Sequence, residues 1–198
     1  SILMEDMFEN MKQGNFLKEK YQLIKLLGKG AFSSVYLATD IEENKNYVIK
    51  EMHIKPFSSE KLLEIFKREA KVLANFYHPN IPRFIDFFIL DEKNIYLVQE
   101  YIEGNNLSVL IKEDKFFTEN EVIKIALDIL DVLEYLHHFS PPIIHRDIKP
   151  ENIIYTKEEK AYLIDFGAVI DELLYDKMMQ QSISTIIGTQ SYMSFEQL

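Results

Sequence analysis

The sequence predicts an α+β fold in two parts, a five-stranded sheet with one main helix followed by a mainly helical region. Apolar and alternating runs that suit strands fill most of the first hundred residues. An apolar pattern of helical spacing interrupts these runs once. A longer helical pattern with a clear N-terminal cap then dominates the second half.

The composition is that of an ordinary globular protein, since 47% of the 198 residues are hydrophobic and 27% are charged. The 32 acidic and 22 basic side chains give a formal net charge of −10, which argues against nucleic-acid binding because phosphate contacts depend on Lys and Arg. The absence of cysteine excludes disulfides and thiolate metal sites, and it fits a reducing compartment. The N-terminus shows no secretory signal, and no apolar run approaches the ~18 residues of a membrane helix. We therefore expect a cytoplasmic protein with no membrane segment in this chain.

The strands of the first half are predicted to follow one another from Tyr21, after an N-terminal extension at residues 1–20. They lie in "YQLIKLL", "VYLATD", "NYVIK", "RFIDFFIL" and "NIYLVQEY", the third ending near Lys50 and the last two forming a hairpin. Between the third and the fourth strand, apolar residues from Leu62 to Phe76 recur at helical spacing, with Ser58 or Ser59 as the N-cap.

The main helix of the second half is predicted in "TENEVIKIALDILDVLEYLHHF". Thr118 followed by Glu121 is the pattern of a capping box. The apolar spacing predicts a buried stripe made of Val122, Ile125, Ala126, Ile129, Leu133 and Leu136. Two short strands, "NIIYT" and "AYLIDF", follow around a "KEEK" turn.

Two features of the first half suit a phosphate ligand. Gly28 and Gly30 stand between two strands, where glycine lets backbone amides approach phosphate oxygens, although an ordinary hairpin uses glycine in the same way. Lys50 ends an apolar strand, which is a common place for a solvated lysine. An ion pair with Glu69, on the buried flank of the following helix, would instead hold its ammonium group toward a ligand.

The stretch "HRDIKPENII" crowds six polar or charged side chains between Ile143-Ile144 and Ile153-Ile154. Asp165 follows a hydrophobic strand in "IDFG", which is also an ordinary way for a strand to end. Together with Asn152 it offers two hard oxygen donors, which suit Mg²⁺ because this ion shares its coordination with phosphates.

Taken in order, these motifs and the closing "GTQSYMSFE" resemble the protein-kinase signature set. From residue 21 onward the sequence is similar to eukaryotic-like serine/threonine protein kinases, with phrases similar to those of bacterial members. The resemblance implies a bilobal kinase fold, with the smaller lobe at residues 21–101 and part of a mainly helical larger lobe at residues 102–198. It also implies transfer of the γ-phosphate of ATP, in the presence of Mg²⁺, to Ser or Thr hydroxyls of protein substrates.

The same resemblance assigns catalytic roles to four residues. Asp147 accepts or orients the proton of the substrate hydroxyl, and Lys149 steadies the transferring phosphate. Lys50, anchored by Glu69, touches the α- and β-phosphates. The nucleotide pocket is assigned to Gly28, Lys29, Gly30, Ala31, Phe32, Ser33, Val35, Val48, Lys50, Gln99, Glu100, Ile102 and Ile154, and the metal to Asn152 and Asp165.

His145 is expected by resemblance to pack rather than to act as a base, in a column with Phe166, Leu73 and Phe84. Lys149, two residues after the catalytic aspartate, follows the serine/threonine pattern, and Thr189 matches the threonine that bonds both residues in such enzymes. Arg146 marks members that are switched by phosphorylation of the activation loop. Candidate acceptors are Ser182, Ser184 and Thr185, although a merely polar loop is the alternative.

Two departures from the family pattern keep other functions open. Phe195 stands where the family has proline, and family members continue past the residue matching Leu198, so the sequence is interpreted as a fragment or as a naturally shortened protein. The alternative function is therefore a truncated nucleotide-binding or interaction module with little or no catalysis. A small-molecule phosphotransferase is disfavoured, because "GTQSYMSFE" belongs to enzymes that dock peptides.

Overall fold

The computed structural model describes residues 16–29, 33–53, 71, 73–90 and 94–166. These residues fall into two compact units. The first holds the described residues of Ser1–Ser59 together with Arg83–Tyr101, and the second holds those of Glu60–Pro82 and Ile102–Leu198. Each unit contains its own β-sheet, and the chain is α+β. The domain boundaries predicted from the sequence stay predictions.

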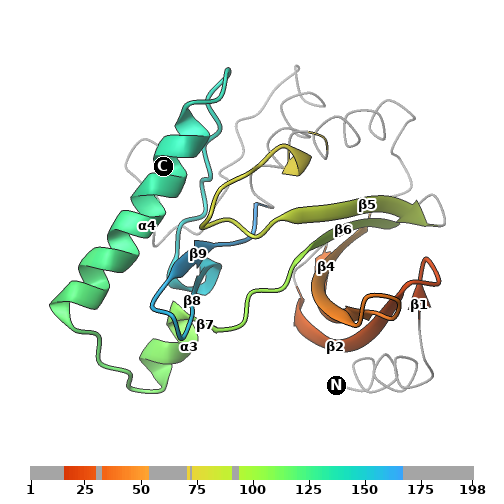
Figure 1. The fold of residues 1–198 in the computed structure, drawn as a ribbon, viewed down its shortest axis with the longest axis horizontal. Coiled ribbons are helices and arrows are strands. Elements are labelled where there is room, and N and C mark those ends of the chain that lie inside the picture. Colours follow the sequence, from red (N-terminus) through yellow and green to blue (C-terminus); the bar gives the residue numbers. More distant parts are fainter. Residues whose placement is uncertain (1–15, 30–32, 54–70, 72, 91–93, 167–198) are drawn as a thin grey trace. The chain divides into compact units, whose positions relative to one another are not determined.

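A curled antiparallel sheet makes up most of the first unit (Figure 1). The five predicted strands are confirmed, and the third runs to His53 instead of ending near Lys50. The sheet also has a sixth strand, Phe16–Leu17, which the sequence does not predict because two residues are too few to show an alternation. In chain order the strands are β1 (Phe16–Leu17), β2 (Tyr21–Lys29), β3 (Ser33–Asp40), β4 (Lys45–His53), β5 (Phe84–Leu90) and β6 (Asn94–Glu100), and across the sheet they follow the order β1-β2-β3-β4-β6-β5.

Side chains join the two outer strands of this sheet. Lys18 Nζ, just after β1, lies 3.0 Å from the Asp86 carboxylate on β5 and 5.0 Å from the centre of the Phe88 ring. Tyr21 stacks on Phe88 with ring centroids 6.2 Å apart. The curl encloses a core of mainly aromatic residues, namely Tyr21, Ala38, Tyr47, Ile49, Phe88, Tyr96 and Val98.

The helix predicted between residues 58 and 76 lies largely outside the described residues. Its described end is helical at Leu73 and Ala74. Leu73 and Phe76 are both buried, as the predicted helical spacing of their apolar stripe requires.

The second unit combines a three-stranded sheet with two described α-helices (Figure 1). The sheet has the order β7-β8-β9, and its strands β8 and β9 are the two short strands that the sequence predicts. Strand β7 and helix α3 have no counterpart in the prediction. The elements are β7 (Asn105–Asn106), α3 (Leu107–Lys112), α4 (Glu119–His137), the 3₁₀ helix η1 (Pro150–Asn152), β8 (Ile153–Tyr155) and β9 (Ala161–Leu163).

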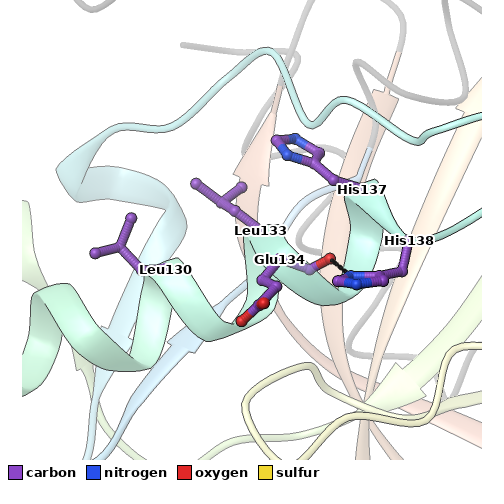
Figure 2. A pocket seen from close by; sticks show the side chains of 5 residues that line it. All are labelled: Leu130, Leu133, Glu134, His137 and His138. Atoms are coloured by element: carbon purple, nitrogen blue, oxygen red, sulfur yellow. Dashed lines mark hydrogen bonds between the residues drawn. The ribbon is translucent and has the colours of Figure 1, made fainter.

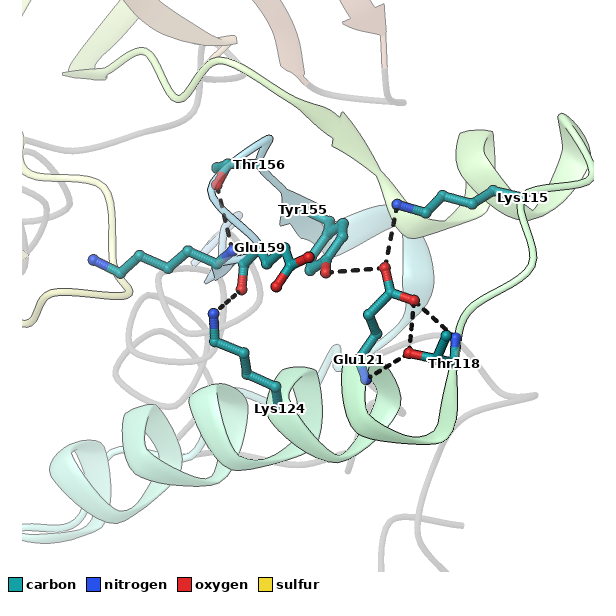
Figure 3. Close-up of polar contacts among 8 residues, drawn as sticks. Lys115, Thr118, Glu121, Lys124, Tyr155, Thr156 and Glu159 are labelled. Carbon is teal, nitrogen blue, oxygen red and sulfur yellow. Dashed lines mark hydrogen bonds and ion pairs between the residues drawn. The ribbon is translucent and has the colours of Figure 1, made fainter.

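The capping box at the start of α4 is confirmed (Figure 3). The Glu121 N–H donates to Thr118 Oγ1 over 3.2 Å, and the Thr118 N–H donates to the Glu121 carboxylate over 2.8 Å. Tyr155 on β8 also donates its hydroxyl to Glu121, and Lys115 Nζ lies 3.7 Å from the same carboxylate oxygen. Hydrogen bonds from Thr118 are the main reason that the pKa of Glu121 is lowered. The cap therefore also ties α4 to the small sheet.

The predicted buried stripe of α4 is confirmed in part, because Ile125, Ile129 and Leu136 are buried. Of the predicted residues, Val122 and Ala126 are exposed and Leu133 is half-buried. The Ala161 N–H at the start of β9 donates to Asp128 over 2.9 Å, so the side of the helix that carries Asp128 faces the sheet. The face that is buried consists of Ile125, Ile129, Val132 and Leu136, and the large apolar residues left exposed on the helix are Val122, Ile123, Leu127 and Leu130.

A pocket of about 420 Å³ lies along the last turns of α4 (Figure 2). Two of its lining residues are hydrogen-bonded to each other, since the His138 Nδ1 donates to the Glu134 carbonyl oxygen over 2.6 Å. Its lining residues, none of which is a predicted site residue, are Leu130, Leu133, Glu134, His137 and His138. Within the residues that the structure describes, no helix has both the length and the apolar character needed to cross a membrane.

Candidate active site

One face of the first unit's sheet gathers five of the residues assigned to the nucleotide. Residues directly opposite each other in an antiparallel sheet share a face, as do residues two apart on one strand. Val35 on β3 lies opposite both Gly28 on β2 and Lys50 on β4. Val48 lies two residues before Lys50, opposite Gln99 on β6. The ladder thus brings these five residues together from four strands.

The opposite face of the same strands is buried, and this supports the side that carries the residues assigned to the nucleotide. Tyr36, Ala38 and Ile49 alternate with the residues above and are 4%, 0% and 0% exposed. Val35, Val48 and Lys50 are half-buried on the other side. A packed layer therefore supports a partly open surface that carries the Lys50 ammonium group.

Several predicted residues of the nucleotide site lie outside the described residues. These are Gly30, Ala31 and Phe32 of the glycine-rich turn, and Glu69. The Lys50–Glu69 ion pair therefore stays a prediction. The flanks of the turn are described, with Lys29 exposed at the end of β2 and Ser33 half-buried at the start of β3.

The segment that follows β6 carries the two predicted backbone contacts. The Glu100 N–H donates to the Arg83 carbonyl oxygen over 2.8 Å, so the backbone group that Glu100 could offer a ligand is its carbonyl oxygen, which would accept a hydrogen bond. Ile102, the first residue of this segment that belongs to the second unit, is 8% exposed.

In the second unit, three predicted residues of the "HRDIKPENII" loop meet at one carboxylate. Lys149 Nζ lies 3.1 Å from Asp147 Oδ2. The Asn152 Nδ2 donates to the same oxygen over 3.0 Å and to the Asp147 carbonyl oxygen over 2.8 Å. Asn152 is 5% exposed and ends the η1 turn, which fixes its amide close to the loop backbone. The Asp147 carboxylate is thus oriented from two sides.

His145 is a buried ring that hydrogen-bonds to the backbone of this loop. It is 1% exposed, and its Nδ1 accepts a hydrogen bond of 3.3 Å from the Asp147 N–H. Since Nδ1 accepts, the proton of the neutral ring lies on Nε2, which donates to the Ile164 carbonyl oxygen over 3.3 Å. Burial lowers the pKa of His145, which favours this neutral form. The ring also meets Phe166 edge to face, with centroids 5.0 Å apart.

The contact between His145 and Phe166 confirms the first step of the predicted packing column. Phe76 extends it, since its ring lies 5.4 Å from that of Phe166. The sequence analysis places Phe76 only in a helical stripe, and nothing in its spacing signals this contact. Phe84 belongs to the first unit, and its place in the column stays a prediction.

Asp165 is brought to the loop by backbone bonds. The Ile164 N–H donates to the Asn152 carbonyl oxygen over 2.9 Å, so the residue before Asp165 is tied to the predicted metal ligand. Asp165 itself is exposed and has φ 61°, and Arg146 has φ 66°. Such left-handed conformations are unfavourable for residues other than glycine and persist where surrounding bonds enforce them.

The donor atoms suit a magnesium ion. Because Nδ2 of Asn152 makes both bonds to Asp147, its acceptor oxygen Oδ1 lies on the other side of the amide group. Asp165 adds an exposed carboxylate. Within the described ranges no cluster of three or more His, Asp and Glu could hold a metal, but Mg²⁺ needs only one or two carboxylates when phosphates complete its shell.

This arrangement can hold a carboxylate ready to receive a proton, with a cation and oxygen ligands beside it. Such a set suits phosphoryl transfer, which depends on positioning and charge neutralisation. Lys50 and its neighbours belong to the first unit and the acidic residues to the second, so their predicted convergence stays a prediction. Thr189, Ser182, Ser184 and Thr185 lie outside the described residues.

A family model described as "Protein kinase domain" matches residues 21–198. "Serine/threonine-protein kinase B" of Synechocystis sp. is 37% identical to this chain over 194 residues, and "Serine/threonine-protein kinase PknA" of Nostoc sp. is 37% identical over 191 residues. "Probable serine/threonine-protein kinase YbdM" of Bacillus subtilis is 39% identical over 158 residues. These alignments cover 92%, 91% and 79% of this chain, but only 33%, 33% and 60% of the respective relatives.

Proposed function

The chain belongs to the protein kinase family, and from this we propose that the protein is a serine/threonine kinase that transfers the γ-phosphate of ATP to protein substrates. The observation that carries the proposal is the Asp147 carboxylate, held by Lys149 at 3.1 Å and Asn152 at 3.0 Å. These are the residues to which the family resemblance assigns the chemistry.

In the proposed reaction the hydroxyl oxygen of a substrate Ser or Thr forms a bond to the γ-phosphorus of ATP. The bond from that phosphorus to the β,γ-bridging oxygen breaks, and ADP leaves with the electron pair. The hydroxyl proton passes to the Asp147 carboxylate. Lys149, already beside this carboxylate, supplies positive charge where the transferred group gains negative charge.

The nucleotide is proposed to contact the sheet face that carries Gly28, Val35, Val48, Lys50 and Gln99. Lys50 would bind phosphate oxygens and the valines the adenine ring, with Ile154 on its other side. Asn152 and Asp165 would hold Mg²⁺, which when bound neutralises phosphate charge and orients the oxygens.

Lys149 supports serine/threonine rather than tyrosine specificity, because the family pattern places a lysine two residues after the catalytic aspartate in serine/threonine members. The relatives named above carry the same specificity in their names. Protein substrates and a cytoplasmic location complete the proposal, the latter resting on the absence of cysteine.

The test is transfer of radiolabel from γ-labelled ATP to a generic basic protein in the presence of Mg²⁺. Asp147→Asn is expected to lower the rate by about 10²–10⁴-fold, because the side chain keeps its shape but loses its basicity. Lys50→Met should also abolish most transfer. Asp114→Asn is the matched control, because Asp114 is exposed on the loop after α3.

Nucleotide binding without transfer by the full-length protein would refute the kinase proposal and favour a binding module. Transfer to a small alcohol but not to protein would instead favour a small-molecule phosphotransferase. Equal activity of wild type and Asp147→Asn would refute the role assigned to that carboxylate.

A further inference from the structure

Gly104 lies where the segment after Ile102 begins to run along β8. A methyl group on its Cα would lie 2.6 Å from the Tyr155 carbonyl oxygen and 2.9 Å from Ile154 Cγ2. Carbon atoms do not approach this closely, and a backbone oxygen cannot move aside as a flexible side chain can. Any other residue at position 104 would therefore push this segment and β8 apart.

The two residues after Gly104 form the only ladder that joins β7 to β8 within the described residues. Asn105 lies opposite Tyr155, and Asn106 lies opposite Ile154. Asn106 also caps α3, because its side chain accepts a 2.9 Å hydrogen bond from the Val109 N–H. A displacement at Gly104 would thus reach all of β7 and the start of α3.

On the other side of this contact, β8 continues directly from the loop that holds the catalytic aspartate. Asn152, bonded to Asp147, immediately precedes β8. Ile154 lies two residues further and is half-buried, next to the position of the missing Cβ of Gly104. The placement of Ile154 therefore depends on how closely the segment at Gly104 approaches.

We infer that Gly104 is a positioning residue for the nucleotide, because its missing side chain lets the segment lie close enough to β8 to fix Ile154. The inference rests on the proposed function, in which Ile154 contacts adenine. It assigns Gly104 an effect on nucleotide affinity that acts through another residue, beyond its contribution to folding.

The experiment measures the dissociation constant of ADP with Mg²⁺ by titration calorimetry in a double-mutant cycle. Gly104→Ala and Ile154→Ala are each expected to raise it about tenfold, since either loses apolar contact with the base. The double variant should bind within about twofold of Ile154→Ala, because two substitutions that act through one contact are not additive. Asn105→Ala is the control, because Asn105 is exposed and adjacent, and it should bind ADP as the wild type does.

Wild-type affinity in Gly104→Ala, or effects that multiply in the double variant, would overturn the inference. Failure of the wild type to bind ADP would instead reject the proposed function. Thermal unfolding of the same variants, with Asn105→Ala as the reference, separates an effect on affinity from an effect on folding.

If Gly104→Ala does not fold, the inference is tested by measuring amide hydrogen exchange of the wild type with and without ADP. ADP is then expected to slow exchange in residues 104–106 and 153–155 together. Protection confined to one of these segments, or to neither, would overturn the inference.

Discussion

Replacing His145 with phenylalanine tests whether hydrogen bonding by this buried ring holds the loop around Asp147. The substitution keeps a ring of similar size against Phe166 but removes the partners of the Asp147 N–H and the Ile164 carbonyl oxygen. Leaving a buried polar group without a partner costs about 1–3 kcal/mol. Both groups are only partly buried, so His145→Phe should lower the free energy of unfolding by about 1–3 kcal/mol in total, out of the ~5–15 kcal/mol of a typical domain.

The difference in the free energy of unfolding between the wild type and His145→Phe should depend on pH. Burial lowers the pKa of His145 below its usual 6.5, so the folded protein binds this proton less readily than the unfolded chain. The stabilisation from neutral His145 is fully present above pH 6.5 and is lost as the pH falls below that value toward the folded pKa. One group changes the free energy of unfolding by at most about 1.4 kcal/mol per pH unit. The gap between wild type and variant should therefore narrow on acidification.

The assay is urea unfolding followed by far-ultraviolet circular dichroism at about pH 7.5 and about pH 5.5. His137→Phe serves as control, because His137 is exposed at the end of α4 and should change stability by less than about 0.5 kcal/mol. A loss below about 1 kcal/mol for His145→Phe, or a gap that stays constant with pH, would refute the reasoning.

Two further predictions concern α4 and use the same unfolding measurement. Thr118→Ala should lower the free energy of unfolding by about 1 kcal/mol, because it removes the N-cap. Thr118→Ser keeps the accepting hydroxyl and should lower it clearly less. Equal losses in the two variants would argue against the capping box. Leu136→Ala should lower the free energy of unfolding by about 2–5 kcal/mol, because this side chain is 0% exposed. Leu127→Ala should lower it by less than about 0.5 kcal/mol, because Leu127 is 61% exposed. Similar losses in the two variants would contradict the buried face described for this helix.

The sequence predicts elements well where the local signal is strong. Thr118 and Glu121 mark the start of α4, and the alternating runs locate five strands of the larger sheet. The buried face of α4 is less predictable, because apolar residues such as Val122 and Val132 occur on more than one side of the helix. The spacing therefore identifies Ile125, Ile129 and Leu136, whereas the inclusion of Val132 in place of Val122 depends on the packing of the helix against β9.

The site follows a similar division. The motif identifies Asp147, Lys149 and Asn152, and the structure brings these three together. The motif does not reveal the left-handed backbone at Arg146 and Asp165, because neither position carries the glycine that signals this conformation most strongly. These angles depend on bonds between segments that are distant in sequence, and only the fold supplies them.

The contacts of Lys18 with Asp86 and Phe88 form a clasp, defined here as the ion pair and the cation–π contact that connect the start of the curled sheet to β5. The family match starts at residue 21, so a protein expressed from that residue onward would lose both the clasp and the strand that shields β2. Strand β2 would then become an edge strand with unpaired backbone amides and carbonyls. These groups could pair with another molecule, which is a common route to self-association. Recombinant versions of this chain should therefore begin before Phe16.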